Sequence, residues 1–577
     1  MKKYINKLIT PVIFGIIVVV SGCSDFLSRP PITSFTDENY WTSEANARTY
    51  AWGLYNAFYG YGNAGGTTGE FYWQSSGSNT RMMFTDNIVN NSFINLPTNA
   101  STTNGWWNDH YVWIRKSNLM LERVETIPNL TVDAENHLLS VARFFRANSY
   151  FNLVAYFGDV PYTDTYVDPK DQDNVWAPRT SRTTVIDNVI ADLEFAAQNM
   201  YENDGLNAVN KYTAYALLAR VCLFEGTYRK YHELGESSTL LQKAKSAAEA
   251  VMNSGRYSLG TSFDAKYNSL DLAANKEMIL FKKYVLSVLA NSIQAYTHSS
   301  TEVNGISKAA IESFVCSDGL PISQSPLYMG DASFNNVIKE RDTRIKAAIG
   351  TGGYSYVGNP LNNGPVATTG YLTNFWDNPS QIKTSTEVVT IGQNHIDAPV
   401  YTYSEILLIY AEACAELGSI SDADLNKSIN LLRKRAGIAD LSVQGTNAYA
   451  NGVQINDPKR SSTLESSSKG GVVSSILWEI RRERRVETMG WVYLRNQDLM
   501  RWGKGDYLDT DKNPDASLGA YLGTTTIPNL TLTNGYINRF PTSTRKFEPK
   551  HYLNSIPTSE MLLYEAEGVT LTQNTGW

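Results

Sequence analysis

The segments that decide the fold are Ile-Arg-Arg-Glu-Arg-Arg-Val-Glu at residues 480–487 and Asp-Leu-Met-Arg-Trp-Gly at residues 498–503. In the first segment, arginines and glutamates recur at intervals of three and four residues beside apolar positions, which is the spacing of a helical face. Arg143 and Arg146 have the same spacing earlier in the chain. Charges on such helices form partly buried ion pairs and hydrogen bonds to loop carbonyls. We therefore expect these residues to stabilise the fold rather than to bind a ligand or act in catalysis.

Several other segments repeat apolar residues with the helical period. The predicted helices cover residues 138–153, 185–200, 214–222, 240–252, 406–417, 424–435 and 473–488. Many form pairs joined by short turns, with alanines where two helices would approach closely. This pattern predicts a mainly α fold, a scaffold of tetratricopeptide-like helical hairpins without a strict repeat period.

Long segments without a helical period separate these helices. They cover residues 60–105, 257–306, 350–400 and 505–557. Irregular segments of this length in a compact chain are usually functional. No linker or block of charge divides the chain, although the polar residues 461–471 are expected to form a flexible insert.

The N-terminus has the features of an export signal. Three lysines among the first seven residues precede an apolar stretch at residues 8–20, which is shorter than the about 20 residues that span a membrane. Val-Ser-Gly-Cys at residues 20–23 resembles the bacterial lipobox. We therefore expect residues 1–22 to be a lipoprotein signal peptide and Cys23 to be lipidated, with the membrane contacted through this anchor only. The alternative is an ordinary signal peptide with a chance cysteine.

Composition argues against several classes of function. The 57 acidic residues outnumber the 50 Lys and Arg residues, so nucleic acid and anionic lipid are not expected to be the main partners. Cys222 and Cys414 lie on apolar helical faces and are expected to be buried free thiols.

Catalytic and metal-binding motifs are absent from the sequence. We find no His-Glu-x-x-His, Gly-x-Ser-x-Gly, P-loop or metal-type cysteine pair, and the six histidines lack ligand spacing. We therefore expect no enzyme activity, no cofactor and no metal site. A carboxylate pair drawn from Glu70, Asp86 and Asp109 is left open as a glycosidase alternative.

Short motifs in a fixed order connect the chain to a known family. They are Tyr40-Trp41, W-x3-Y-x2-I-x3-N at residues 107–118, ARFFRA at 142–147, YFGDVPY at 156–162, CSDGLP at 316–321, RDTR at 341–344, EILLIYAEA at 405–413, INLLRKRAG at 429–437, the two charged segments above, and QNTGW at 573–577. Together they resemble the SusD/RagB nutrient-binding lipoproteins of Bacteroidetes outer membranes. Two motifs depart from the family pattern, with Asn-Thr-Gly-Trp at the C-terminus and Thr402-Tyr403 before the Ala-Glu-Ala helix.

The resemblance implies a single binding domain over residues 23–577. Its tetratricopeptide-like part would extend to about residue 260, and a loop-rich family region would follow from residue 261 to the C-terminus. It also implies a protein on the outer face of the outer membrane that captures a polysaccharide or oligosaccharide. A SusC-like TonB-dependent transporter would then import the glycan. The alternatives are peptide capture, as in RagB-like members, and a helical-repeat scaffold that binds another protein.

The loops contain the residue types that bind sugars. A sugar ring presents an apolar face and a fringe of hydroxyl groups, so its site needs exposed aromatic rings beside planar polar side chains. Aromatic residues make up 12% of the chain, and residues 59–113 interleave them with glycine and polar residues. The candidate glycan-binding residues are Tyr61, Tyr72, Trp73, Arg81, Asp86, Asn104 and Trp106 in this loop, and Tyr356 and Trp376 in a second strip. Trp107, Tyr111 and Trp113 lie in a periodic segment, where core packing is at least as good an interpretation.

Overall fold

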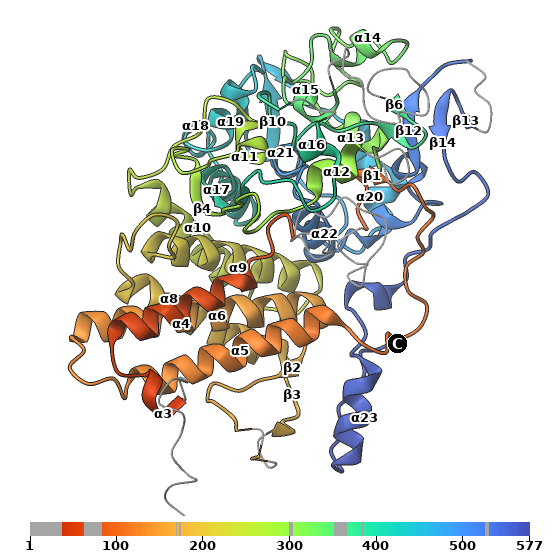
Figure 1. Cartoon of the computed structure of the whole chain (residues 1–577). Helices are drawn as coiled ribbons and strands as arrows, with labels where there is room; N and C mark the ends of the chain where they lie inside the picture. The colour runs from red at the N-terminus through yellow and green to blue at the C-terminus, as the bar shows by residue number, and fades with distance from the viewer. Residues whose placement is uncertain are drawn as a thin grey trace, which may run out of the picture.

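The structure is a computed structural model that describes residues 37–62, 84–168, 170–171, 175–298, 304–350, 366–381, 385–524 and 530–577. The fold is mainly α-helical, as predicted, with short strands and 3-10 helices between the helices. Figure 1 shows the long helices of the N-terminal half packed together in the lower part of the view and the shorter elements above them. None of the helices in these ranges is long and apolar enough to cross a membrane.

The scaffold consists of long helices that pack in sequence order. They are α4 (Glu44–Leu54), α5 (Gly105–Val124), α6 (Val132–Phe157), α8 (Arg182–Asn199), α9 (Lys211–Tyr231) and α10 (Ser237–Met252), with the short α3 (Asp37–Tyr40) before them. From α5 to α10, each helix packs against the next, which is the arrangement of stacked helical hairpins. Thr131, Ser181 and Asn210 cap the N-termini of α6, α8 and α9 by accepting backbone N–H groups. The predicted scaffold of helical hairpins is confirmed.

One predicted helix is wrong. Residues 424–435 form two helices, α18 (Asp422–Asn426) and α19 (Ile429–Arg435). Ser428 separates them because its φ and ψ of −137° and −97° are not helical and its hydroxyl donates to the Asp424 carbonyl. By contrast, α6 ends at the predicted place, before Gly158. Gly158 has a φ of +75°, which residues with a Cβ atom rarely adopt.

Short elements fill the segments that lack a helical period and the C-terminal region. The helices are α11 (Ala265–Asn268), α12 (Ile293–His298), α13 (Lys308–Ile311), α14 (Phe334–Ile338), α15 (Ile345–Ala348), α16 (Thr386–Val389), α17 (Tyr403–Glu416), α20 (Thr463–Ser467), α21 (Ser475–Glu487), α22 (Val492–Arg501) and α23 (Thr558–Ala566). The 3-10 helices are η1 (Tyr55–Ala57), η3 (Pro458–Ser461), η4 (Gly505–Leu508), η5 (Pro514–Ala516) and η6 (Pro549–Tyr552). α17 packs against both α10 and α21, so it joins the scaffold to the C-terminal region.

The strands form small antiparallel sheets. They are β1 (Ile88–Val89), β2 (Val160–Pro161), β3 (Arg179–Thr180), β4 (Met278–Lys282), β5 (Gly305–Ile306), β6 (Val366–Ala367), β7 (Gly370–Tyr371), β8 (Ala398–Thr402), β9 (Leu441–Gln444), β10 (Asn447–Ala450), β11 (Val453–Gln454), β12 (Leu518–Tyr521), β13 (Thr531–Thr533) and β14 (Tyr536–Asn538). The largest has the order β1-β5-β7-β6, and the others are β11-β10-β9, β12-β14-β13, β2-β3 and β4-β8.

A large apolar cluster joins the N-terminal and C-terminal parts, since it includes side chains from Trp41 to Leu571. Cys222 and Cys414 are buried and unbonded to another cysteine, as predicted, and Cys316 is buried in the same way. Burial raises the pKa of the Cys222 thiol to about 12. A thiol with this pKa is a structural group rather than a reactive one.

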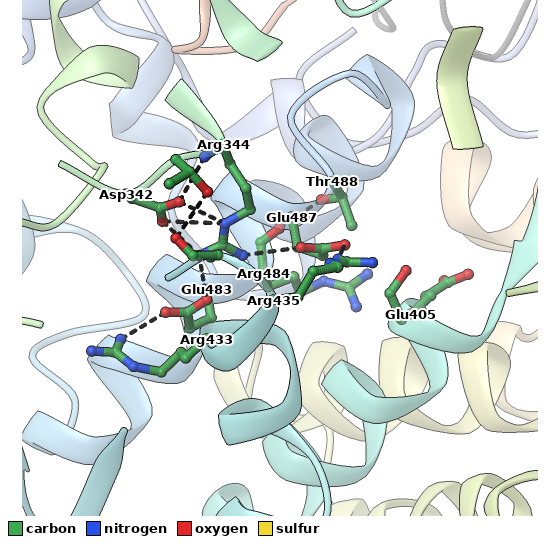
Figure 2. Close-up of polar contacts among 12 residues, drawn as sticks. Asp342, Arg344, Glu405, Arg433, Arg435, Glu483, Arg484, Glu487 and Thr488 are labelled. Atoms are coloured by element: carbon green, nitrogen blue, oxygen red, sulfur yellow. Dashed lines mark hydrogen bonds and ion pairs between the residues drawn. The ribbon is translucent and has the colours of Figure 1, made fainter. Parts of the chain in front are cut away.

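α21 contains the charged segment at residues 480–487, and the charges of this segment are buried in ion pairs. Figure 2 shows Arg344 beside Asp342, Glu483 and Glu487. The guanidinium nitrogens of Arg344 lie 2.6 Å from Asp342, 2.8 Å from Glu483 and 3.0 Å from Glu487. Arg433 contacts Glu483 at 2.7 Å. The predicted structural role of this charged segment is confirmed.

The same network continues through Lys266 and Arg435, each of which pairs with both Glu487 and Glu277. Four cations therefore face four carboxylates among side chains that are at most 6% exposed. This balance matters because an uncompensated buried charge is strongly destabilising.

Other charges of α21 contact different parts of the chain. Arg484 pairs with Asp498 of α22 at 2.8 Å, and Arg481 pairs with Glu416 of α17 at 2.9 Å. Arg482 pairs with both Glu479 and Asp457. The same kind of contact occurs in the scaffold, where Arg146 pairs with Asp192 at 2.8 Å and donates to the Asp164 carbonyl.

The polar residues 461–471 are not a loose insert, so that prediction is wrong. They include α20, whose Glu465 is 1% exposed and pairs with Lys504. Lys504 also donates to the Gly471 carbonyl at 2.6 Å, and Gly470 donates to the Gly503 carbonyl. A buried ion pair therefore fixes this polar segment, which sequence periodicity does not reveal.

Replacing Glu487 with glutamine tests the role of the network. At pH 7 we expect Glu487→Gln to lower the free energy of unfolding by about 3–5 kcal/mol, because Lys266, Arg344 and Arg435 lose a shared carboxylate. Burial alone would raise the pKa of Glu487. The three cations outweigh the effect of burial and hold this pKa well below its ordinary value of 4.5. A carboxyl group with a lowered pKa stabilises the fold above pH 4.5. The difference in unfolding free energy between Glu487→Gln and wild type should therefore shrink as the pH falls below 4.5.

The measurement is urea denaturation followed by circular dichroism. Glu565→Gln is the matched control, since Glu565 is exposed on α23 and its change should stay within about 0.5 kcal/mol. A Glu487→Gln protein as stable as the control at pH 7 would show that the network does not stabilise the fold.

Candidate functional site

Trp106 is not an exposed platform, so this part of the predicted site is wrong. It is 2% exposed at the start of α5. Its ring stacks between Tyr59 and Tyr156, with centroid separations of 5.0 and 5.2 Å and interplanar angles of 21° and 26°. The aromatic sandwich fills the position that a sugar ring would need, and Trp106 is therefore a core residue.

Tyr61 and Trp376, predicted in separate strips, are also buried, at 6% and 0% exposure. Burial raises the pKa of Tyr61 well above its usual value, and the Trp376 side chain lowers that pKa by less, so the two residues lie close together. The Tyr61 hydroxyl also donates to the Tyr267 carbonyl at 2.7 Å. The two strips therefore meet, but these members form the base of the region rather than its surface.

Asp86 and Asn104 have structural contacts as well. Asp86 is 0% exposed and lies 2.8 Å from Arg495 and 2.9 Å from Arg485. Burial raises the pKa of its carboxyl, but the two arginines outweigh this effect and lower the pKa to about 2. Asn104 caps α5 by accepting the backbone N–H groups of Trp106 and Trp107. Asp86 is not placed to contact a sugar, which corrects that prediction. Asn104 is half-buried and only its side-chain oxygen takes part in the cap, so its assignment stays a prediction.

Four predicted residues lie outside the described residues. They are Tyr72, Trp73, Arg81 and Tyr356. Their assignment as glycan-binding residues stays a prediction.

The sheet β1-β5-β7-β6 brings the ends of the two predicted loops together. β1 follows residues 63–83 closely, and β6 follows residues 351–365 directly. Ile88 pairs with Ile306, and Ile306 pairs with Tyr371, which in turn pairs with Val366. Segments far apart in sequence therefore leave from one small sheet, and the sheet is the floor of the candidate site.

Close backbone contact makes this sheet dependent on glycine. A Cβ atom at Gly305 would lie 2.6 Å from the Gly370 nitrogen, and one at Gly519 would lie 2.3 Å from the Thr369 carbonyl oxygen. Real side chains do not tolerate such distances, so β5, β7 and β12 can approach only with glycine at these positions.

Buried side chains fix both ends of the segment at residues 63–83. At its start, the Tyr284 hydroxyl donates to the Gly62 carbonyl at 2.6 Å. At its end, Asn496 donates to the Phe84 carbonyl at 2.7 Å, and Asp86 pairs with Arg485 and Arg495. Charges of α21 and α22 therefore position the end of the loop that contains most of the predicted platform.

The neighbouring segments are fixed in a similar way. Gly350 donates to the Leu372 carbonyl at 3.2 Å, which places the start of residues 351–365 beside their end. His298 of α12 lies 3.2 Å from Asp377, and Asn91 donates to the Asn304 side chain at 2.8 Å. These contacts join three segment ends around the same sheet.

Two half-buried tyrosines beside this sheet were not predicted from the sequence. Tyr521 of β12 and Tyr536 of β14 have ring centroids 5.0 Å apart, and β12 packs against β7. The Tyr536 hydroxyl contacts Asp331, and Lys308 lies over the Tyr536 ring at 5.1 Å. A partly exposed aromatic ring beside a carboxylate suits sugar binding, and both rings are added to the candidate site. Only the long-range strand pairing reveals them.

Within the described ranges, no group of three or more His, Cys, Asp or Glu side chains is arranged to bind a metal ion. Asp109, one of the acids considered for catalysis, accepts a hydrogen bond from Tyr59 at 3.4 Å. Asp86 is neutralised by two arginines, and Glu70 lies outside the described residues. Asp86 is therefore not an exposed member of such a carboxylate pair, and a pair of Glu70 with Asp109 stays a prediction.

Comparison with known proteins identifies the family. The family model of the SusD family matches residues 248–577, which is more than half of the chain. The chain belongs to the SusD family. A second SusD-like model, described as starch-binding and associating with the outer membrane, matches residues 36–223. The two models follow the order in which the scaffold and the loop-rich region occur.

Curated relatives of the SusD family resemble the chain at modest identity. A SusD-like protein of Bacteroides ovatus is 24% identical over 509 residues, which cover 84% of this chain and 80% of the relative. SusD-like protein P38 of Formosa agariphila is 26% identical over 267 residues, which cover 45% of this chain and 48% of the relative. The match to the Formosa protein therefore spans about half of its length.

Solved structures of SusD-like proteins share the fold. A SusD-like carbohydrate binding protein from Bacteroides fragilis has a TM-score of 0.67 at 20% identity and covers 91% of this chain and 99% of its own. A laminarin binding SusD-like protein has a TM-score of 0.57 at 16% identity, with coverage of 93% and 100%. Both of these neighbours are described as carbohydrate-binding proteins.

Two tryptophan variants separate a sugar platform from a core residue. We expect Trp73→Ala to weaken binding of the bound glycan by about 1–3 kcal/mol, by analogy with the loss of base stacking on an aromatic ring. We expect Trp106→Ala to lower the free energy of unfolding by about 3–5 kcal/mol through the cavity it creates, with unchanged affinity of the folded protein.

Isothermal titration and urea denaturation measure the two effects. Trp52→Ala is the matched control, since Trp52 is 52% exposed on α4 and neither quantity should change. Loss of affinity in Trp106→Ala at unchanged stability would contradict the core assignment, and full affinity in Trp73→Ala would remove Trp73 from the site.

Proposed function

We propose that this protein captures a polysaccharide or oligosaccharide at the bacterial surface and presents it to a SusC-like TonB-dependent transporter for import. The observation that carries the proposal is membership of the SusD family over both parts of the chain. The description of the N-terminal model supports an association with the outer membrane. The glycan binds above the sheet β1-β5-β7-β6, where the loop ends meet.

The chemistry of the loops supports sugar over peptide. Residues 59–113 combine aromatic rings with asparagine, glutamine and glycine, and carry modest charge. Aromatic rings stack on the apolar face of a sugar, while amides donate and accept hydrogen bonds from its hydroxyl groups. The fixed loop ends reduce the conformational entropy lost on binding, which favours affinity.

The lipid anchor is part of the proposed mechanism. The Cys23 thiol takes a diacylglycerol, cleavage then removes residues 1–22 and frees the Cys23 amine, and a third acyl chain follows. The chain from Cys23 to Asp37 reaches at most roughly 50 Å when extended. The tether therefore keeps the binding loops close to the membrane and to the mouth of the transporter. A short tether raises the effective concentration of the captured glycan at that mouth.

A whole-cell binding experiment tests surface capture. Cells that express the protein are incubated with a panel of fluorescently labelled polysaccharides, and retained fluorescence is measured with and without an excess of a mixed peptide pool. We expect retention of at least one polysaccharide, insensitive to peptide. The Cys23→Ala variant should appear in the soluble fraction and leave its cells unlabelled, while the purified variant still binds the same polysaccharide in an affinity gel.

Two outcomes would contradict the proposal. Displacement of the polysaccharide by the peptide pool, or binding of peptide alone, would make the protein a peptide receptor. Equal retention by cells that express Cys23→Ala would show that the anchor is not needed for capture.

A further inference from the structure

A cavity of about 290 Å³ lies between α21 and α22, and Asp86, two residues before β1, contributes to its lining. One face of α21 lines it with Trp478, Arg481, Arg482 and Arg485, at intervals of three and four residues. Arg495, Leu499 and Trp502 from α22 and its C-cap line the facing wall. The volume is at the lower end of the roughly 300–1,000 Å³ that small-molecule sites occupy.

The cavity is covered on one side and open on another. α20 contributes Leu464 and Glu465 to the cover, and the Lys504–Glu465 ion pair fixes this helix in place. Lys459 and Lys512 line the rim with side chains that are 46% and 47% exposed. The cavity therefore opens to solvent beside these two lysines.

A buried arginine has a hydrogen-bond donor left over at this cavity. Arg481 is 7% exposed, and its Nε is buried without a hydrogen-bond partner. Arg485 and Arg495 also line the cavity, and their Nε and Nη2 atoms contact Asp86 and Asn87. Buried donors without acceptors are costly, so the wall favours a ligand that is rich in acceptors.

The charges of the cavity are unevenly distributed. At one end the single carboxylate of Asp86 faces both Arg485 and Arg495, which leaves one positive charge in excess. Burial lowers the pKa of Arg485 to about 10, partly offset by Asp86, as expected for an undercompensated cation. At the other end one cation, Arg482, faces the two carboxylates of Asp457 and Glu479. The positive end suits an anionic group, and the acidic end suits donors such as hydroxyls.

Trp478 lies at the acidic end. Its side chain is half-buried, it lines the cavity, and its Nε1 donates to Asp457 at 3.1 Å. Along α21 it lies two turns before Arg485, so an indole and a cationic group line the same cavity. Together they match a ring that has an apolar face, one negative group and several hydroxyls.

We propose that this cavity binds a single sugar residue that carries a negative charge, either a carboxylate or a sulfate ester. The anionic group contacts Arg485 and Arg495, the ring lies against Trp478, and hydroxyl groups donate to Asp457. The choice of a sugar over another small anion rests on the proposed function. The site itself rests on the geometry of α21 and α22.

Isothermal titration of the soluble Cys23→Ala protein tests the proposal. The probes are D-glucuronate, D-galactose 6-sulfate, D-glucose, acetate and inorganic sulfate. We expect one of the two charged sugars to bind with a stoichiometry of one and at least about ten times more tightly than D-glucose or either simple anion. The two charged sugars distinguish a carboxylate from a sulfate ester.

Two variants locate the binding. Arg485→Gln removes the excess charge and should weaken binding of the charged sugar at least about tenfold. Because Arg485 also contacts Asn87, Leu464→Trp provides a second test that fills the cavity and leaves all of its ion pairs in place. Arg460→Gln is the matched control, since Arg460 is on η3 but does not line the cavity, and it should not change the affinity.

Several results would overturn the proposal. They are no binding of either charged sugar, equal binding of D-glucose or of a simple anion, and unchanged affinity in Leu464→Trp. Failure of the proposed function has a different signature, because cells then retain no polysaccharide while the charged monosaccharide still binds. Retention of a polysaccharide by cells, without binding of any charged monosaccharide, rejects the cavity site alone.

Discussion

The pairing of the buried charges on α21 is the constraint on which the rest of the structure depends. Its glutamates and arginines contact α17, α19 and α22, and Arg485 contacts Asp86 beside β1. Removing one partner from a buried pair leaves a charge in a medium of low dielectric constant, which costs several kcal/mol. Each of these segments must therefore adopt its place at the same time, so one helix couples the scaffold, the C-terminal region and the loop region.

This coupling explains how a protein with long irregular loops can bind a glycan. Loops contribute affinity when a rigid base limits the entropy that they lose on binding. Tyr284 fixes the Gly62 end of one loop and Asp86 fixes the other end, while Gly350 and Val366 connect the second loop to Tyr371 and Leu372. The sheet β1-β5-β7-β6 is too small to be stable alone. Arg485 of α21 and Arg495 of α22 hold its β1 end in place through Asp86.

Local signals were sufficient for the helices. The helical period of the apolar residues predicted α6, and Gly158 predicted where this helix ends. The spacing of the charged residues identified α21 as a structural helix. The break at Ser428 and the order of residues 461–471 were missed, because a side-chain hydrogen bond and a distant lysine produce them. For the site, composition predicted two loops whose ends the structure brings together, but it did not separate buried rings from exposed ones. Trp106 looks like a platform in sequence, and only its stacking between Tyr59 and Tyr156 shows that it is buried.

The most direct test of where the glycan binds is a crystal structure of the protein with a bound oligosaccharide, chosen as the tightest ligand of the polysaccharide panel. We predict a sugar chain above β1-β5-β7-β6, in contact with side chains from residues 63–83 or 351–365. The ion pairs at Glu483 and Glu487 should be unchanged. An oligosaccharide bound instead on the helical scaffold of α5, α6 and α8, with no contact to these loops, would contradict this prediction.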